Sequence, residues 1–259
     1  MFCMLLAFDI GNSHITMGAY QGEDRKLVAR MVTDTSRTDD QYAIELHDIL
    51  HLYGMEGQPI DGAIICSVVP ELCAPLKSAV YKLTGAEPLV VGPGVKTGLN
   101  ILIDNPAQLG ADLVAGAVAA IAKYPLPCAV FDMGTATTIS VIDHAGNFVG
   151  CMISSGVGIA LRALTDHTAL LPHVSIEWPP VLIGKNTVQS MQSGMLNGTV
   201  AMMDGMATRI EKELDQPVTM IATGGFAHLT APHCEHEFVL ADYLLLDGLR
   251  IIYDKNHRR

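Results

Sequence analysis

The sequence predicts an α/β protein built from two related halves. A short apolar run, an Asp, a Gly two residues later and a second strand-like stretch occur at residues 5–20 and recur at 128–142. The two copies lie almost half of the 259-residue chain apart. In both halves, short apolar runs typical of strands alternate with longer segments of helical periodicity. A duplicated strand–turn–strand motif therefore organises the predicted fold.

The first half begins with three strands and continues with alternating helices and strands. Residues 39–53 place Ala43, Leu46 and Ile49 on one side of a predicted amphipathic helix. The run at 63–66 is continuously apolar, as a strand covered on both faces requires. Pro70 favours the first turn of a helix. The predicted elements are strands at 3–9, 14–20, 27–33, 63–66 and 89–91, and helices at 39–53, from 70 onward and at 107–123.

The second half repeats this beginning and ends in helices. We expect strands at 127–132, 136–143, 147–153, 218–222 and near Val239, and helices at 156–166, 187–214, after Gly225 and at 243–256. The change from one half to the other falls near the end of the helix at 107–123. The predicted lobes are residues 1–118 and 119–259.

Composition narrows the class of protein. Apolar residues make up 49% and charged residues 17%, so each half can form a core, and the net charge of −11 argues against a nucleic-acid or anionic membrane surface. The six cysteines form no C-x-x-C pair, which favours reduced thiols in a cytoplasmic protein. We expect no signal peptide, since no basic region precedes the first apolar stretch, and no membrane span, since no apolar run approaches about 20 residues.

The first acidic turn is Asp9-Ile10-Gly11-Asn12-Ser13. A carboxylate at a strand end can hold a hydrated Mg²⁺, and a Gly lets backbone N–H groups approach phosphate oxygens. By itself an Asp-x-Gly pattern also fits an ordinary hairpin turn. The second copy, Asp132-Met133-Gly134-Thr135, favours the functional interpretation: two acidic hairpins that grip the phosphates of one nucleotide.

Two further segments carry polar or small residues where a ligand could bind. Thr223-Gly224-Gly225 ends a strand before a helix, which suits a nucleoside but also fits an ordinary strand–helix turn. Asp112, in Gly110-Ala111-Asp112, lies near a helix start. It is either a first-turn carboxylate favoured by the helix dipole or a general base for phosphoryl transfer.

These motifs, in this order, resemble the acetate and sugar kinase/actin superfamily. Further segments narrow the resemblance to type III pantothenate kinases over about residues 4–254. They are Ser67-Val68-Val69-Pro70, Gly94-Val95-Lys96-Thr97-Gly98-Leu99-Asn100, Asp104-Asn105-Pro106, Gly110-Ala111-Asp112, Gly184-Lys185-Asn186-Thr187 and Asp247-Gly248-Leu249. The resemblance implies a duplicated ribonuclease-H-like (actin-like ATPase) fold and a kinase that transfers the γ-phosphate of ATP to pantothenate. It also implies Mg²⁺, a monovalent cation (K⁺ or NH₄⁺) and a homodimer, with the helix at 187–214 at the interface.

The resemblance also assigns roles to single residues. Asp112 would be the proton acceptor, and Asp132 would bind the monovalent cation. The ATP residues would be Asp9, Gly11, Asn12, Ser13, Thr16, Thr135, Gly224 and Gly225, with Mg²⁺ held at Asp9 through water. Pantothenate would contact Gly110, Ala111, Asp112, Leu113 and, across the dimer interface, Thr187.

Three positions depart from the family pattern on the acceptor side. Leu113 stands where the family has an Arg, and Ile103 where it usually has a Tyr that contacts pantothenate. The third is the segment 150–156, where Cys151 replaces a Gly and Ser155 a Pro. The leading hypothesis is ATP-dependent pantothenate phosphorylation. The alternatives are a catalytically weakened nucleotide-binding or regulatory paralogue, and a kinase for a different small hydroxyl acceptor.

Overall fold

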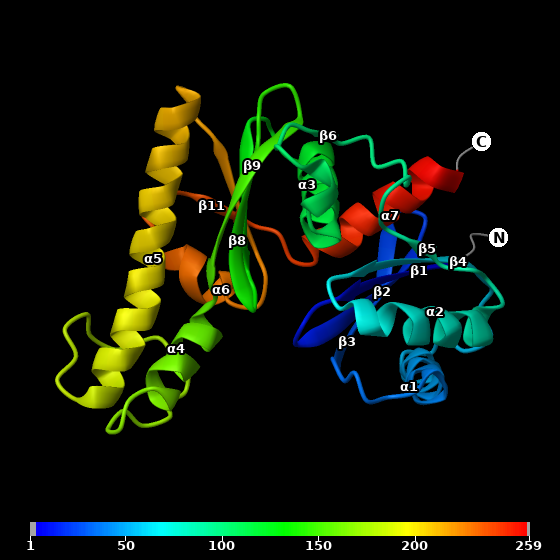
Figure 1. The fold of residues 1–259 in the computed structure, drawn as a ribbon, viewed down its shortest axis with the longest axis horizontal. Coiled ribbons are helices and arrows are strands. Elements are labelled where there is room, and N and C mark those ends of the chain that lie inside the picture. Colours follow the sequence, from blue (N-terminus) through cyan, green and yellow to red (C-terminus); the bar gives the residue numbers. More distant parts are fainter. Residues whose placement is uncertain (1–3, 258–259) are drawn as a thin grey trace. The chain divides into compact units, whose positions relative to one another are not determined.

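The computed structural model describes residues 4–257 and divides them into two compact units (Figure 1). Within the described residues, the first unit contains residues 4–99, Asn105–Ala119 and residues 244–257. The second contains Asn100–Asp104 and Ala120–Tyr243. The strand expected from residue 3 starts at Met4 in the described part of the chain, and Cys3 lies outside that part.

The sheet of the first unit has the strand order β3-β2-β1-β4-β5. β1 pairs antiparallel with β2 and parallel with β4, so it is a central strand. The helices of this unit include α1, α2, α7 and the larger part of α3. The bounds are β1 Met4–Ile10, β2 His14–Gln21, β3 Asp24–Val32, α1 Asp39–Leu52, β4 Ile60–Ser67, α2 Pro70–Thr84, β5 Leu89–Val90, α3 Ala111–Lys123 and α7 Leu244–His257.

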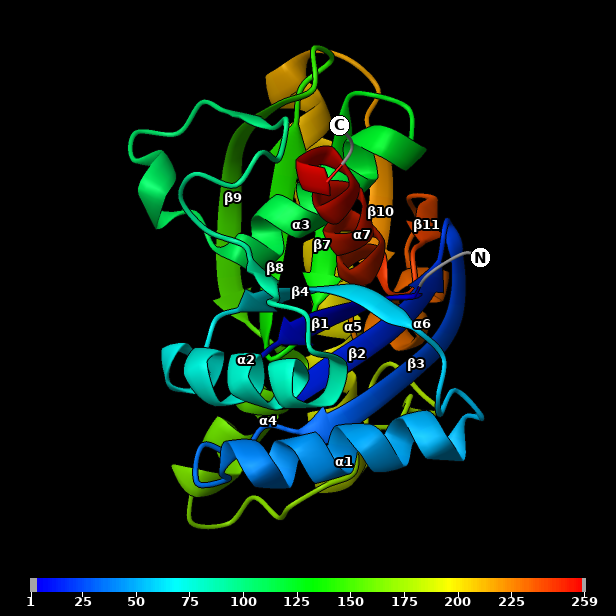
Figure 2. The same cartoon turned by 90° about the vertical axis from the view of Figure 1, so that its right-hand side faces the viewer.

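One face of this sheet forms the hydrophobic core with α1 and α2. Leu6, Phe8 and Ile10 of β1 point into that core together with alternate residues of the neighbouring strands. Thr38 caps α1 in a capping box with Gln41, and Gly85 ends α2 in the left-handed conformation. Figures 1 and 2 show both helices against the same face of the sheet.

The opposite face of the first sheet is covered in part by α7. Leu246 of α7 packs against Gly18, and Tyr253 packs against Gly62. Asp247 is buried and accepts hydrogen bonds from Tyr20 Oη at 2.7 Å and Arg25 Nη1 at 3.0 Å. Gly248 lies directly against the backbone of Ala115 in α3. The C-terminal helix therefore belongs to the first unit, whereas the expected lobes of 1–118 and 119–259 placed it in the second. Contacts between segments so distant in sequence leave no local signal.

The sheet of the second unit has the strand order β11-β10-β7-β8-β9-β6. The long helix α5 packs through Met203, Ala207 and Ile210 on the face formed by alternate residues of β7. The bounds are β6 Asn100–Ile101, β7 Cys128–Met133, β8 Ala136–Ile142, β9 Asn147–Ser155, α4 Val157–Asp166, α5 Thr187–Leu214, β10 Thr219–Thr223, α6 Ala227–Thr230 and β11 Phe238–Leu240.

The two sheets repeat one topology. The order β3-β2-β1-β4-β5 corresponds to β9-β8-β7-β10-β11, and in each sheet an antiparallel hairpin is followed by a parallel neighbour on the other side. This confirms the duplication expected from the sequence. The short strand β6, which no sequence pattern indicated, adds to β9 at the edge of the second sheet.

One expected helix is shorter than the sequence pattern indicated. The segment expected as a helix from 107 contains a 3-10 turn at Pro106–Gln108, and the α-helix starts only at Ala111, because Gly110 accepts the first helical hydrogen bond, from the Val114 N–H. The helix after Gly225 has four residues. In residues 4–257, no helix combines the length and hydropathy needed to cross a bilayer.

Candidate active site

The first acidic turn joins β1 to β2. Gly11 donates its backbone N–H to His14 O at 3.0 Å and closes the turn. Thr33, which follows β3, donates its hydroxyl to Gly11 O at 2.6 Å and its N–H to Ser13 O at 3.1 Å. These bonds hold the backbone of the turn against the end of β3, with Asn12 exposed at its tip. The turn is thus a fixed backbone loop beside the Asp9 carboxylate.

Asp9 lies on the sheet face opposite the hydrophobic core. Its direct partners are Thr16 on β2 and Cys66 on β4. Residues directly opposite each other on paired strands point to the same face, so the three side chains form one row. The predicted phosphate residues Asp9 and Thr16 are therefore neighbours in space.

Asp112 occupies the first turn of α3. Its Oδ1 accepts the backbone N–H of Leu113 at 2.8 Å, the bond expected of a carboxylate at a helix start. Burial raises the pKa of the Asp112 carboxyl, and the hydrogen bonds from the backbone N–H groups of Leu113 and Asp112 itself offset that effect only in part. A raised carboxylate pKa is a property of a general base, and the helix-start bond alone would lower it.

Gly110 makes room for that carboxylate. A Cβ at position 110 would overlap Asp112 Oδ1, so any larger residue would displace the carboxylate. Gly110 was predicted to contact substrate; the structure gives it this spatial role beside Asp112.

Cys66 connects the two carboxylates of the first unit. Its thiol is buried, and burial followed by the negative charges of Asp9 and Asp112 raises its pKa well above the usual range. The strand register sets Asp9 directly beside Cys66, and the carboxylate of Asp112 is near enough for its charge to act on the thiol. Asp9 and Asp112, which are far apart in sequence, thus both belong to the first unit and both act on the charge state of the same buried thiol. Sequence reasoning did not assign Cys66 to this site, although its place at the end of a buried strand was a usable signal.

The second acidic turn is built in the same way in the second unit. Asp132 pairs with Thr138 on β8 and with Thr223 on β10. Gly134 closes the turn by donating to Ala136 O at 3.1 Å. Gly156 packs so closely on the carbonyl groups of Gly134 and Thr135 that a Cβ there would overlap both. Thr135 is exposed at the tip.

The Thr223-Gly224-Gly225 segment packs directly on this turn. A Cβ on Gly224 would overlap Asp132 Oδ1 and the backbone of Met133, and Gly224 has a positive φ of 88°. Phe226 donates its N–H to Met133 O at 3.1 Å. Gly225 is exposed, and a Cβ there would meet no atom within 4 Å. The second unit therefore brings together Asp132, Thr135, Gly224 and Gly225.

Thr187 is exposed at the first position of α5. Asn186 caps this helix by accepting the Gln189 N–H at 2.9 Å, and Gly184 packs against the backbone of Gln189 and Ser190. Because Thr187, like Asp132, belongs to the second unit, its part in a site with Asp112 stays a prediction, as does the grip of both acidic turns on one triphosphate.

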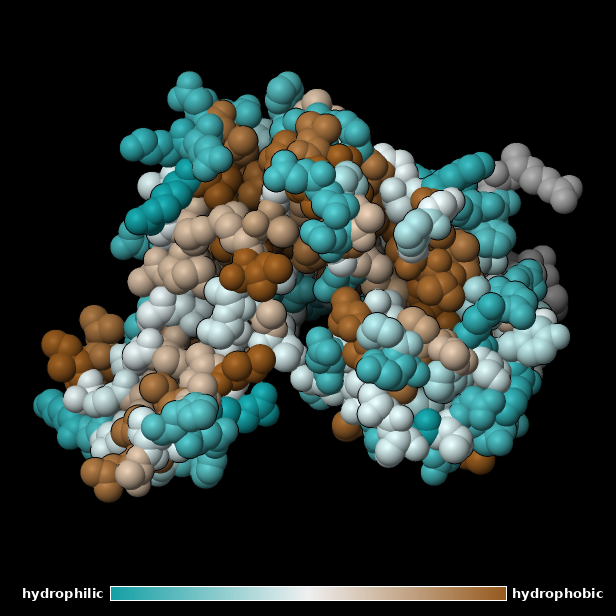
Figure 3. Space-filling model, in the orientation of Figure 1, coloured by the Kyte–Doolittle hydropathy of each residue, from teal (hydrophilic) through white to brown (hydrophobic). Residues whose placement is uncertain are grey.

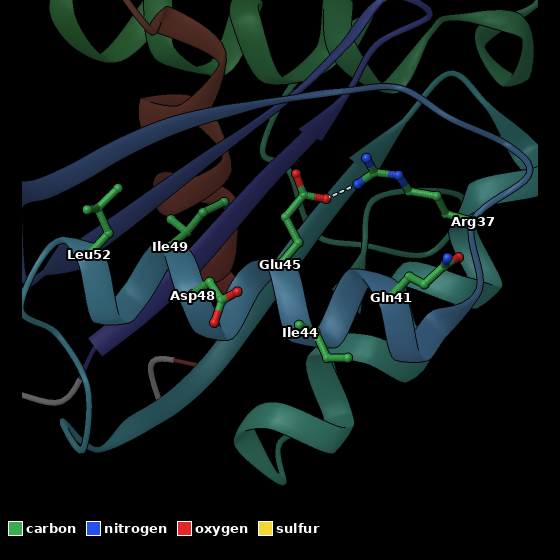
Figure 4. Close-up of a pocket in the computed structure, with 7 residues that line it drawn as sticks. All are labelled: Arg37, Gln41, Ile44, Glu45, Asp48, Ile49 and Leu52. Atoms are coloured by element: carbon green, nitrogen blue, oxygen red, sulfur yellow. Dashed lines mark hydrogen bonds and ion pairs between the residues drawn. The ribbon is translucent and has the colours of Figure 1, made fainter.

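Histidines near the C-terminal part of the second unit lie beside carboxylates. His228 pairs with Asp242 at 2.7 Å, and His236 pairs with Asp204 at 3.1 Å, so these histidines have carboxylate partners of their own. A shallow depression lies on the outer side of α1 and is lined by Arg37, which pairs with Glu45, and by Ile44 and Leu52 (Figure 4). It contains none of the residues predicted for catalysis or binding.

Comparison with known proteins decides the family. The family model described as "Type III pantothenate kinase" matches residues 5–209. A type III pantothenate kinase of an Exiguobacterium species is 40% identical over 255 residues, which cover 98% of this chain and 100% of that protein. A type III pantothenate kinase of Geotalea uraniireducens is 42% identical over 253 residues, or 98% and 99% of the two chains.

The chain belongs to the type III pantothenate kinase family. A solved structure from Campylobacter jejuni, of a protein assigned to the Baf family of transcriptional activators, superposes with a TM-score of 0.58. The superposition covers 97% of this chain and 98% of the Campylobacter jejuni chain. The two sequences are 19% identical, so the similarity bears on the fold alone. The duplicated ribonuclease-H-like fold expected from the sequence is confirmed.

The three departures from the pattern of type III pantothenate kinases lie on partly or fully exposed positions. Leu113 follows Asp112 in the first turn of α3, and Ile103 belongs to the short segment after β6 in the second unit. Cys151 is exposed on β9, and a Cβ on its neighbour Gly150 would meet no atom within 4 Å. None of these side chains is fully buried in a core. Packing therefore does not fix which residue stands at these positions, and the ligand can.

Proposed function

We propose that this protein transfers the γ-phosphate of ATP to the terminal hydroxyl of pantothenate, the first step of coenzyme A biosynthesis. The observation that carries the proposal is the 40% identity, over nearly the full length of the chain, to a protein named type III pantothenate kinase. The first unit also contains both the Asp9 turn and the partly buried carboxylate of Asp112. A proton acceptor and a phosphate-binding turn are the two parts that phosphoryl transfer to an alcohol requires.

In the proposed reaction, Asp112 accepts the proton of the pantothenate hydroxyl as its oxygen bonds to the γ-phosphorus. The bond from that phosphorus to its bridging oxygen breaks, and ADP leaves with the electron pair. The raised pKa of Asp112 makes it a stronger base than an exposed carboxylate. The turn from Gly11 to Ser13 and the Thr16 hydroxyl would position the phosphates. Most of the rate would come from positioning and electrostatics.

The donors around Asp9 fit a hard divalent cation. Mg²⁺ prefers oxygen ligands and retains several waters, and Asp9 and Thr16 offer oxygen atoms while the raised pKa of Cys66 keeps its sulfur protonated. Bound there through water, Mg²⁺ would offset the negative charge of the phosphates. In the second unit, Asp132 would hold K⁺ or NH₄⁺, and Thr135, Gly224 and Gly225 would contact ATP, where Gly225 leaves open space.

We also propose a homodimer formed through the second unit. Leu170, Leu182 and Ile183 are 92%, 69% and 82% exposed, and Val188 at the start of α5 is also exposed. Figure 3 shows hydrophobic surface around this end of α5. Exposed apolar side chains concentrated in one region are typical of a protein interface.

Ile183→Asp should therefore shift the protein from dimer to monomer. A charge in a desolvated apolar interface costs more than the lost contact alone, because it has no partner there. Size-exclusion chromatography with light scattering measures the mass of both proteins. Leu52→Asp on α1 is the matched control, since Leu52 is 79% exposed on the first unit. A dimeric Ile183→Asp protein, or a monomeric parent protein, would contradict the proposed interface.

The cytoplasm is the proposed location, where ATP and reduced thiols occur together. Cys66 and Cys128 are buried, and burial raises the pKa of the Cys128 thiol to about 12. Such thiols are poor nucleophiles and resist oxidation. Nucleic acid and membrane are not among the proposed partners, given the net charge of −11.

An ADP-release assay with pantothenate, ATP, Mg²⁺ and K⁺ tests the activity. We expect pantothenate-dependent ADP release, with formation of phosphopantothenate checked by mass spectrometry. If ATP binds in calorimetry but no turnover occurs, the alternatives apply: a nucleotide-binding regulatory protein, or a kinase for another small alcohol. Leu113 and Ile103 are the residues that favour these alternatives.

The double substitution Leu113→Arg with Ile103→Tyr should raise kcat/KM for pantothenate. A guanidinium beside the acceptor can clamp a carboxylate or neutralise charge, which Leu cannot do, and one such donor is typically worth about 10²–10³ in rate. Steady-state kinetics with varied pantothenate at saturating ATP measures the gain. An unchanged or lower kcat/KM would show that the acceptor pocket is not a weakened version of the family's pocket.

A further inference from the structure

Arg30 lies in the same row of side chains as the predicted phosphate residues. The strand register pairs Cys66 with Asp9, Asp9 with Thr16, and Thr16 with Arg30, across β4, β1, β2 and β3. Directly paired residues point to one face, and burial agrees: Leu27, Ala29 and Met31 of β3 point into the core, so Arg30 points away from it. The guanidinium is therefore on the face that carries Asp9.

The distances allow Arg30 to act at that site. Neighbouring strands lie about 4.8 Å apart, so the backbone of Arg30 is two strand spacings from Asp9 with only Thr16 between them. An extended Arg side chain is longer than one spacing, so its guanidinium reaches past Thr16 toward a group held at Asp9. β3 is an edge strand, and Arg30 is exposed and able to change rotamer.

The charge of Arg30 is available to a ligand. Arg25 on the same strand pairs with Asp247, and Lys26 pairs with Asp24. In the described part of the chain, no carboxylate pairs with Arg30. A cation with no carboxylate partner among residues 4–257, on the sheet face that carries the Asp9 turn, favours an anionic ligand beside that turn.

The second copy of the motif provides an internal comparison. Its corresponding row is Thr223, Asp132, Thr138 and Ile153, so an exposed Ile occupies the place of Arg30. Only the first copy combines the acidic turn with a cation. The Asp9 turn, which is expected to hold the phosphates, therefore has a cation in its row. The Asp132 turn, which is expected to hold a monovalent cation, does not.

We propose that Arg30 binds the triphosphate of the nucleotide from the β3 side of the Asp9 turn, opposite Asp112. This rests on the proposed function in so far as ATP is the donor. Arg30 offers a planar guanidinium for bidentate contact with phosphate oxygens. Together with the turn, it would hold the phosphoryl group in line between the leaving ADP and the hydroxyl at Asp112. It would also supply a positive charge next to the phosphate that is transferred. Leu113, which stands where the family has an Arg, supplies no such charge.

The test compares Arg30→Gln with Arg30→Lys and with Lys26→Gln. Lys26→Gln removes one positive charge from the same strand without touching the row. Calorimetric titrations with MgATP and with AMP, in the absence of pantothenate, give Kd values. For Arg30→Gln we expect about 10- to 100-fold weaker binding of MgATP and little change for AMP. Arg30→Lys should recover part of the loss, and Lys26→Gln should bind like the parent protein.

Three results would overturn the inference. One is equal MgATP binding by Arg30→Gln and the parent protein. Another is an equal loss of MgATP affinity in Lys26→Gln, which would reflect net charge alone. A rise in KM for pantothenate with unchanged MgATP binding would assign Arg30 to the acceptor instead and also overturn it. Because binding is measured without pantothenate, a chain that never phosphorylates pantothenate would refute the proposed function and still test Arg30.

Discussion

Asp112→Asn should reduce kcat for pantothenate phosphorylation by about 10²–10⁴-fold, the usual contribution of a positioned general base. Asn has nearly the shape of Asp, and its amide oxygen can still accept the Leu113 N–H, so the start of α3 should be kept. The loss should therefore appear in kcat, with MgATP binding close to that of the parent protein. Steady-state kinetics and calorimetry separate the two effects.

The pH dependence gives this prediction a second measurement. A general base works only when ionised, so kcat/KM should fall as the pH drops through the pKa of Asp112, which burial holds above its ordinary value of 3.8. Asp112→Asn should remove this acid limb from whatever activity remains. Turnover within about tenfold of the parent protein, or an unchanged acid limb, would place the base elsewhere.

The same carboxylate should destabilise the folded protein near neutral pH. Because the pKa of Asp112 is higher in the folded than in the unfolded chain, stability falls as the pH rises from 3.8 through the raised folded value. Asp39, at the start of α1, is the contrasting case, because hydrogen bonds from Lys82 and Ser78 lower its pKa to about 2. Its contribution to the stability of the folded protein is therefore present above pH 3.8 and is lost as the pH falls toward 2. At pH 7 we expect Asp112→Asn to raise Tm and Asp39→Asn to lower it.

Local patterns in the sequence were sufficient for the duplicated hairpins. Each acidic turn joins two strands that are adjacent in the chain, so short apolar runs flanking an Asp-x-Gly turn were enough to predict both strands and the turn between them. The positions of Asp9 and Asp132 at strand ends followed from the same patterns, whereas the central place of β1 and β7 in their sheets is shown only by the structure. Asp112 was placed on the correct helix, although Gly110 starts that helix later than the apolar periodicity indicated.

Contacts between distant segments could not be predicted in this way. The row that includes Cys66 and Arg30 depends on pairing among β4, β1, β2 and β3, and no single segment shows that register. β6 is two residues long and has no periodicity to detect. The position of α7 in the first unit depends on Asp247 and Gly248, whose partners lie more than 100 residues away in the chain.

Gly248 is the residue at which that packing is most sensitive to substitution. α7 is held along the sheet by Asp247, which binds Tyr20 and Arg25, so the helix has little freedom to slide. A Cβ at position 248 would overlap the carbonyl oxygen of Ala115 in α3. Neither the Cβ nor the carbonyl oxygen can move without its helix. The overlap can therefore be relieved only if α7 and α3 move apart.

Gly248→Ala should therefore lower the stability of the folded protein by roughly 1–3 kcal/mol, the usual cost of an overpacked core. Helix propensity alone predicts the opposite sign, because Ala is favoured over Gly in a helix by about 1 kcal/mol. For a chain of this size, each kcal/mol lowers Tm by about 2–4 °C. Because Ala115 lies one turn beyond Asp112 on α3, a shift of α3 should also reduce turnover at temperatures where the protein is still folded.

Gly116→Ala is the matched control for this substitution. It lies on α3 in the same helix pair, and its Cβ would meet Leu245 Cδ1 at 3.8 Å, an ordinary contact. We expect Gly116→Ala to leave Tm unchanged or to raise it, with kcat unaffected. Thermal unfolding followed by circular dichroism compares the two variants under identical conditions. If Gly248→Ala were as stable as Gly116→Ala, α7 would not pack on α3 at the separation described, and the support it gives to the helix of Asp112 would have to come from other contacts.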